Sequence, residues 1–224
     1  MRSARQRGLF CRALCLIAAI LVGSVCLSGC GASGAATNNS TNATSSASPV
    51  TSPGADTTKG ASAKVTLIGD SVPLGAVSEL KADLPGITLL VDTDRTLSGA
   101  GLTTLKQESK QGKLGDIVVL ALGTNYLVAS DIDQAMKVIG SQKQVVFVNC
   151  YRNNLPYVPE VNATIAAAAK KYANFTVCDW YGYVKSHPDL QLADDNCHLT
   201  ASSAQAYADL IKQSVDSVRA KVGD

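Results

Sequence analysis

A continuous apolar run at residues 116–122 (DIVVLAL) constrains the fold of this chain more than any other feature. A strand that is apolar along its whole length must be covered on both faces, as in the parallel sheets of α/β proteins. Four other short β-rich runs occur along the chain, and segments with the apolar spacing of helices separate them. We predict strands at residues 64–69, 87–91, 116–122, 144–149 and 175–179.

The segments between the strands fit helices of ordinary length. We predict helices at residues 73–84, 98–111 and 159–172, one capped by Ser130 or Asp131, and a last one capped by Thr200. Five strands that alternate with helices imply a doubly wound parallel sheet in a three-layer α/β/α sandwich. In such folds the functional site lies at the carboxyl ends of the strands.

The N-terminus has the features of a secretory signal. Four arginines precede an apolar stretch at residues 13–27, which is shorter than the roughly 20 residues that a membrane-spanning helix needs. The ending at residues 27–30 (LSGC) resembles the bacterial lipobox, which implies a signal peptide at residues 1–29 and a lipid on Cys30. The alternative is an uncleaved anchor helix in which Cys30 has no role.

Residues 30–63 are expected to form a flexible tether, because Gly, Ala, Ser, Thr, Asn and Pro dominate them. Residues 64–224 then form a single catalytic domain. The full chain has 20 basic and 18 acidic residues, and residues 1–29 hold four of the basic ones and no acidic one. The remainder is mildly acidic and has no basic run, which argues against binding to nucleic acid.

Three cysteines remain once the signal and Cys30 are set aside: Cys150, Cys178 and Cys197. In an oxidising compartment they fit one disulfide and one free thiol. We expect a Cys150–Cys197 bond. Cys150 closes the fourth strand and Cys197 lies in the loop between Asp195 and His198, which places both at the same edge of the sheet. Cys150–Cys178 is the main alternative. No cysteine pair has zinc-ligand spacing and no nucleotide-binding glycine motif is present, so we expect neither a metal nor a cofactor.

Residues with hydrolytic chemistry follow the predicted strands. Ser71 comes directly after the first strand, and Asp195 and His198 precede the last helix. Histidine is suited to deprotonate a serine hydroxyl at neutral pH, and a carboxylate fixes its tautomer. The backbone N–H of Ser71 and the side-chain amide of Asn125 could stabilise an oxyanion. Pro73 stands where the second glycine of an α/β-hydrolase elbow would be, which disfavours that fold.

This set of residues resembles the SGNH (GDSL-like) hydrolases, and most of all the extracellular catalytic domain of peptidoglycan O-acetyltransferases. The resemblance covers about residues 64–220 and implies a flavodoxin-like SGNH fold. It implies Ser71 as nucleophile, His198 as base, Asp195 as its partner, and a further backbone donor for which Asp94 is the nearest match. The motifs that carry it are residues 65–72 (VTLIGDSV), 121–125 (ALGTN), 148–149 (VN), 179–181 (DWY) and 198–199 (HL).

The sequence therefore predicts a lipid-anchored enzyme on the extracellular face of the membrane that acts on cell-envelope glycan through an acetyl-Ser71 intermediate. The acceptor distinguishes an O-acetyltransferase from an O-acetyl esterase. A transferase would need a separate membrane acyltransferase to supply acetyl groups. A non-catalytic glycan-binding lipoprotein is the second alternative.

Four aromatic residues, Tyr126, Tyr151, Tyr157 and Trp180, follow the third, fourth and fifth predicted strands. They could form a platform that faces a sugar, or they could pack in the core and at its rim.

Overall fold

The computed structural model describes residues 63–222. The predicted signal peptide, the lipid site at Cys30 and nearly all of the predicted tether lie outside the described residues. Ala63, which we placed at the end of the tether, is buried in the core. No helix among residues 63–222 is long and apolar enough to cross a membrane.

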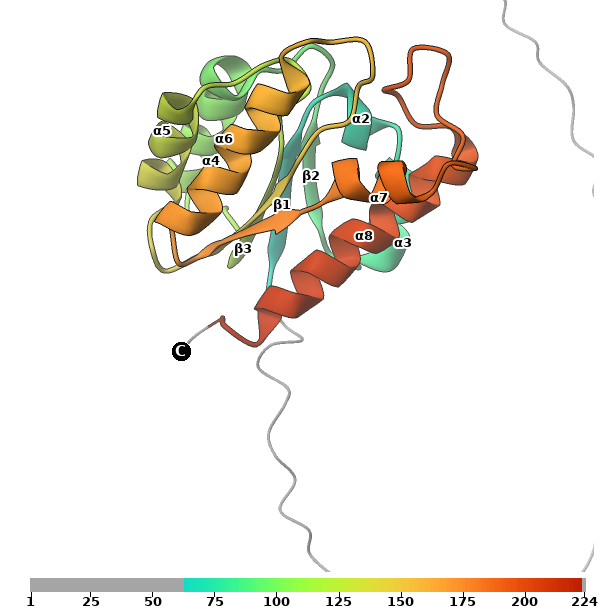
Figure 1. The fold of residues 1–224 in the computed structure, drawn as a ribbon. Coiled ribbons are helices and arrows are strands. Elements are labelled where there is room, and N and C mark those ends of the chain that lie inside the picture. The colour runs from blue at the N-terminus through green and yellow to red at the C-terminus, as the bar shows by residue number, and fades with distance from the viewer. Residues whose placement is uncertain (1–62, 223–224) are drawn as a thin grey trace, which may run out of the picture. The chain divides into compact units, whose positions relative to one another are not determined.

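The five predicted strands form one sheet, which confirms the predicted fold class (Figure 1). The strand order is β2-β1-β3-β4-β5, and all neighbouring strands are parallel. This is the flavodoxin-like order of doubly wound sheets. The strands are β1 (Val65–Gly69), β2 (Thr88–Val91), β3 (Ile117–Ala121), β4 (Gln144–Val148) and β5 (Phe175–Cys178).

Helices cover both faces of the sheet, as the apolar strands require (Figure 1). Alternate residues of β3 enter different cores: Val119 packs beneath one helical layer and Leu120 beneath the other. The first layer contains α2 (Ser71–Leu74), α3 (Val77–Asp83), α7 (Trp180–Ser186) and α8 (Ala201–Arg219). The second layer contains η1 (Leu97–Gly101), α4 (Leu102–Lys110), α5 (Ala129–Ile139) and α6 (Val158–Lys171).

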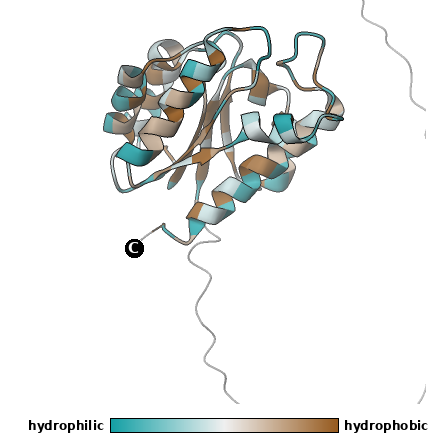
Figure 2. Cartoon of the chain, viewed as in Figure 1, coloured by the Kyte–Doolittle hydropathy of each residue, from teal (hydrophilic) through white to brown (hydrophobic). Residues whose placement is uncertain are grey.

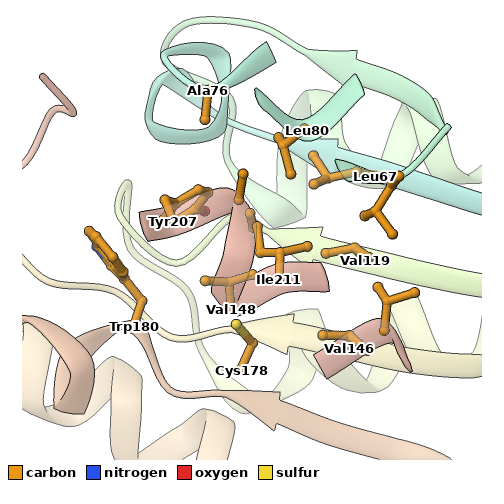
Figure 3. Close-up of a cluster of buried hydrophobic side chains, with 14 of the residues drawn as sticks. Leu67, Ala76, Leu80, Val119, Val146, Val148, Cys178, Trp180, Tyr207 and Ile211 are labelled. Atoms are coloured by element: carbon orange, nitrogen blue, oxygen red, sulfur yellow. The ribbon is translucent and has the colours of Figure 1, made fainter. Parts of the chain in front are cut away.

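The core beneath α8 packs this helix on one face of the sheet (Figure 3). Tyr207 and Ile211 of α8 pack on strand residues, and Trp180 meets the ring of Tyr207 edge-on at 5.0 Å between centroids. Figure 2 shows the hydrophobic residues concentrated on the central strands and the hydrophilic ones on the surrounding helices and loops. Trp180 is fully buried. Of its two predicted roles, a platform that faces a sugar and packing in the core, the structure shows the second.

Several helix boundaries differ from the predicted ones. The segment 73–84 contains two short helices, α2 and α3, and the segment 98–111 begins with η1, which is kinked at Gly99. The predicted cap of α5 was wrong, because Val128 occupies the N-cap and donates its N–H to the Asp131 carboxylate at 3.0 Å. Helix α7 was not predicted, although Asp179 caps it by accepting the Gly182 N–H at 2.9 Å.

The register of the sheet aligns the carboxyl ends of three strands. Gly69 at the end of β1 is level with Val91 of β2 and with Ala121 of β3. The loops that follow these strands therefore begin side by side at one edge of the sheet. The predicted site residues Ser71, Asp94 and Asn125 lie in or next to these loops.

Thr200 caps α8, as predicted, and also holds the loop before it. Its hydroxyl accepts the Ser203 N–H at 3.4 Å and donates to the Gln191 carbonyl at 2.7 Å. Replacing the hydroxyl by a methyl group in Thr200→Val should lower the free energy of unfolding by about 1 kcal/mol, the usual effect of a lost cap. Urea denaturation measures this change.

Ser217→Ala is the matched control, because it removes an exposed hydroxyl near the other end of α8. It should change the unfolding free energy by less than about 0.5 kcal/mol. A Thr200→Val protein as stable as the parent would show that the cap and the loop contact contribute nothing.

Candidate active site

The turn after β1 places Ser71 at the edge of the sheet. The Asp70 N–H donates to the Ala121 carbonyl at 3.0 Å, which continues the sheet by one residue. The Asp70 carboxylate then accepts the Val72 N–H at 3.0 Å and caps α2, whose first residue is Ser71. The chain thus passes from strand to helix at Asp70, and Ser71 lies at this junction as the first residue of α2.

The structure brings together the three residues that the sequence predicted as a catalytic triad. The distance from Ser71 Oγ to His198 Nε2 is 2.8 Å, and that from His198 Nδ1 to Asp195 Oδ2 is 2.5 Å. Ser71 and His198 are 127 residues apart in the sequence. The arrangement is the hydrogen-bonded chain in which an imidazole can accept the serine proton while a carboxylate orients it.

The loop that carries Asp195 and His198 is organised around the Asp195 carboxylate. Its Oδ1 atom accepts the N–H groups of Cys197 at 3.1 Å and His198 at 3.0 Å, and Oδ2 faces the imidazole. The hydrogen bond from the His198 N–H, together with the contact to its side chain and the Cys197 N–H, lowers the pKa of Asp195. The carboxylate therefore stays ionised at neutral pH, as a partner of the imidazole must.

Cys197 fastens this loop to the domain. Its side chain is fully buried in the core beneath α8, and burial raises its pKa to about 11. A buried thiol of this kind behaves as a small apolar side chain. The loop is thus held at two points, by Cys197 in the core and by the Thr200 hydroxyl, which donates to the Gln191 carbonyl.

The expected Cys150–Cys197 disulfide is absent, and among residues 63–222 all three cysteines are free thiols. The reason is the position of Cys150, which packs in the other core, on the α6 side of the sheet. There Asn162 of α6 accepts the Cys150 N–H at 3.0 Å and donates to its carbonyl at 2.8 Å. The alternative pairing with Cys178 is not formed either.

Asp195, Cys197 and His198 form the one group among the described residues with metal-ligating atoms within 4.8 Å of one another. The donor chemistry does not favour a metal. The carboxylate and the imidazole Nδ1 face each other, and the Cys197 thiol is buried with a raised pKa, whereas a metal ligand must be a thiolate.

Two of the predicted oxyanion-hole residues, Asp94 and Asn125, lie in the loops after β2 and β3. The Asn125 side-chain amide donates to the Arg95 carbonyl at 3.3 Å, which fixes it against the loop that contains Asp94. The Arg95 guanidinium in turn donates to the carbonyls of Leu90 and of Gly69, the latter at 3.4 Å. Asp94 has a left-handed backbone, with φ of 53°, and makes no hydrogen bond in the part of the chain that the structure describes.

Asp70 is a site residue to which the sequence analysis gave no role. It is buried, and desolvation raises its pKa to about 6, against the lowering effect of the Val72 N–H and of the His198 charge. Its Oδ2 atom and the Trp180 Nε1 atom have no hydrogen-bond partner among the described residues. Both residues line one cavity of about 10 Å³, roughly the size that holds one water molecule. The signal in the sequence was an aspartate between the first strand and a helix.

Comparisons with known proteins agree with the hydrolytic chemistry that the site geometry indicates. No family model matches the chain. The O-acetyltransferase OatA of Staphylococcus aureus is 28% identical over 152 residues, which are 67% of this chain and 25% of that protein. The chain therefore spans about a quarter of the length of the curated relatives it matches.

Two solved structures share the fold. The C-terminal catalytic domain of Streptococcus pneumoniae peptidoglycan O-acetyltransferase A, solved with a methylsulfonyl adduct, is 26% identical. Its TM-score is 0.64, over 70% of this chain and 94% of that one. A lipase/acylhydrolase from Enterococcus faecalis is 21% identical, with a TM-score of 0.59 over 71% and 96% of the two chains. The resemblance to SGNH hydrolases and O-acetyltransferase domains is confirmed, and the predicted class, an SGNH-type acyltransferase or esterase, is supported.

The raised pKa of Asp70 has a consequence for stability. Unfolded aspartate ionises near pH 3.8 and folded Asp70 near pH 6, so the folded state binds more protons between these values and loses stability as the pH rises. Asp70→Asn removes this titration. Relative to the parent, the variant should gain on the order of 2–3 kcal/mol of unfolding free energy between pH 4 and pH 7.

Denaturation curves at half-unit pH steps measure the difference. Asp133→Asn is the control, because the Lys171 ammonium lowers the pKa of Asp133, and its pH dependence has the opposite sign. A difference between Asp70→Asn and parent that stays constant from pH 4 to pH 7 would show that Asp70 ionises normally in the folded protein.

Proposed function

We propose that this protein is a serine-dependent acetyl ester enzyme of the cell envelope, similar to the peptidoglycan O-acetyltransferases, and that Ser71, His198 and Asp195 are its catalytic residues. The observation that carries the proposal is the continuous hydrogen-bonded chain from Ser71 Oγ through His198 to Asp195. The likeness to O-acetyltransferase domains supports it.

In the proposed reaction Ser71 Oγ attacks the carbonyl carbon of an acetyl ester, and the Ser71 proton moves to His198 Nε2. The ester oxygen then leaves with that proton, and acetyl-Ser71 remains. In the second half, an acceptor hydroxyl gives its proton to His198 and attacks the acetyl carbon. The bond from that carbon to Ser71 Oγ then breaks, and Oγ takes the proton back from His198, which restores the enzyme. The Ser71 N–H and the Asn125 amide would stabilise the negative oxygen in both halves.

The acceptor decides which enzyme this is. A sugar hydroxyl of the cell-envelope glycan gives an O-acetyltransferase, and water gives an O-acetyl esterase. We favour the transferase because the relative with the higher TM-score is a peptidoglycan O-acetyltransferase domain. The transferase would receive acetyl groups from a separate membrane acyltransferase, and the lipid on Cys30 would hold it on the extracellular face of the membrane.

A chromogenic acetate ester, offered with and without a chito-oligosaccharide, separates the two activities. Acetylated sugar detected by mass spectrometry supports the transferase. Acetate release that the sugar does not change supports the esterase. If neither occurs, and methanesulfonyl fluoride fails to add one methylsulfonyl group to Ser71, the result supports the second alternative, a non-catalytic glycan-binding lipoprotein.

Ser71→Ala should abolish turnover and leave the fold intact, because it removes only the attacking oxygen. The loss of a triad member lowers the rate by several orders of magnitude, to roughly 10⁻⁴ or less. Acetate release and circular dichroism measure the two effects. A folded variant that retains most of its activity would exclude Ser71 as nucleophile.

Asn125→Ala should lower kcat by about 10²–10³-fold with little change in KM, because its amide acts mainly when charge develops on the substrate oxygen. Gln134→Ala, which removes an exposed amide on α5, is the control and should keep normal kinetics. A rise in KM alone would assign Asn125 to ground-state binding.

A further inference from the structure

Two buried side chains each have a polar atom without a hydrogen-bond partner among residues 63–222. The atoms are Asp70 Oδ2 and Trp180 Nε1, and both residues are only 1% exposed. A carboxylate oxygen accepts hydrogen bonds and an indole N–H donates them, so the two atoms are chemically complementary. Buried polar groups in folded proteins nearly always have a partner, either in the protein or in an ordered water molecule.

Asp70 and Trp180 line the same cavity, whose volume is about 10 Å³. Gly123 and Thr124 after β3 and Asn149 after β4 line it as well. A cavity of this volume holds one water molecule, provided that polar groups are there to bind it. A water molecule that accepts the indole N–H keeps two protons to donate, and one of them can go to the carboxylate.

Asn149 fixes the residues on either side of Trp180. Its side-chain amide donates to Asp179 Oδ1 at 2.6 Å, and its side-chain oxygen accepts the Tyr181 N–H at 2.7 Å. The Trp180 ring is held in turn by its edge-on contact with Tyr207 (Figure 3). The two sequence motifs that contain Asn149 and Trp180, for which the proposed reaction has no use, therefore build one wall of the cavity.

The other carboxylate oxygen of Asp70 holds the turn that carries the nucleophile. Oδ1 accepts the Val72 N–H at 3.0 Å, and Ser71 lies between these two residues. One hydrogen bond leaves the carboxylate free to rotate about it, whereas a second partner at Oδ2 would fix the carboxylate plane. The position of the turn, and with it that of Ser71, would then depend on what binds Oδ2.

We propose that one water molecule occupies this cavity, accepts the Trp180 indole N–H and donates to Asp70 Oδ2, and that this water bridge makes Trp180 a positioning residue for Ser71. The bridge joins the start of α7 to the start of α2. The positioning role rests on the proposed function, whereas the water bridge itself does not.

The charge of Asp70 decides how strongly it needs a donor. Burial raises its pKa to about 6, so the carboxylate is ionised at neutral pH and Oδ2 is then an acceptor alone. Charged and titratable groups face Asp70 from several elements: the Arg95 guanidinium, which donates to the Gly69 carbonyl, the imidazole of His198, the thiols of Cys150 and Cys197, and the hydroxyl of Tyr207.

Most of these groups keep their charge between about pH 4 and pH 8. Burial raises the pKa of both thiols and of the phenol, so all three stay neutral, and a guanidinium stays positive. The imidazole is the neighbour whose side-chain type titrates in this range. It is present in every protein compared below, so differences between these proteins report on the Trp180 N–H.

A crystal structure of the protein that resolves ordered water tests the bridge directly. One water molecule should lie within about 3 Å of both Trp180 Nε1 and Asp70 Oδ2. A cavity that holds no water, or a water that contacts only one of the two atoms, overturns the bridge.

A second test removes the indole N–H without changing the size of the ring. Trp180 is the only tryptophan of the chain, so replacing tryptophan by benzothienylalanine, in which sulfur takes the place of the N–H, changes this one group. Carbon-13 NMR of the aspartate carboxyl groups follows Asp70, whose signal is the one absent from Asp70→Asn. Its midpoint should lie near pH 6 in the parent and at higher pH in the benzothienylalanine protein, because the carboxylate has lost a donor.

Tyr183→Phe is the matched control. It removes a hydroxyl from the ring that stacks on Trp180, outside the cavity, and should leave the Asp70 midpoint unchanged. An equal midpoint in the parent and the benzothienylalanine protein, or the same increase in Tyr183→Phe, overturns the bridge.

The positioning role predicts an effect on kcat rather than on KM. The benzothienylalanine protein should hydrolyse the chromogenic acetate ester with a kcat about 3–10-fold lower than the parent, the usual effect of one hydrogen bond, and with the same KM. An unchanged kcat overturns the positioning role and keeps the bridge. If the parent itself is inactive, the proposed function and the positioning role fail together, while the crystal structure and the Asp70 titration still decide whether the bridge exists.

Discussion

The contact between Ser71 Oγ and His198 Nε2 joins the first loop of the sheet to the last. It forms only if β1 and α8 are fixed relative to each other, and the core beneath α8 provides this: Tyr207 and Ile211 pack on the strands, and Trp180 packs on Tyr207. Cys197 enters the same core from the loop that carries the histidine. The apolar packing of α8 therefore determines the geometry of the polar site at its N-terminal end.

Strands and site could be predicted from the sequence because both depend on local patterns. The apolar run at 116–122 requires cover on both faces, and polar residues that follow parallel strands meet at one edge. The disulfide failed because the order of strands does not say on which face a side chain lies, and Cys150 packs on the α6 side. Helix α7 was missed because it has only seven residues, three of which are aromatic.

Backbone strain is concentrated at the proposed site. In the described part of the chain, non-glycine residues with left-handed backbones are Asp94, Tyr126 and Asn196, and each lies in a loop at the carboxyl edge of the sheet. Glycines take such conformations at Gly86, Gly112 and Gly140, in turns that lead into strands at the other edge. Burial of the Asp70 carboxylate disfavours its ionised form, which adds a cost in folding free energy at the same edge. In residues 63–222 the left-handed non-glycine residues therefore lie at the edge of the sheet where we propose the chemistry.

The hydrogen bonds that the Asp195 carboxylate accepts limit how Asp195 and His198 can move relative to each other. Because the carboxylate accepts both backbone N–H groups of its own turn as well as facing the imidazole, the two residues cannot change their separation without unfolding that turn. The acid–base pair therefore behaves as one local unit, and the burial of Cys197 in the core beneath α8 fixes the position of that unit relative to Ser71.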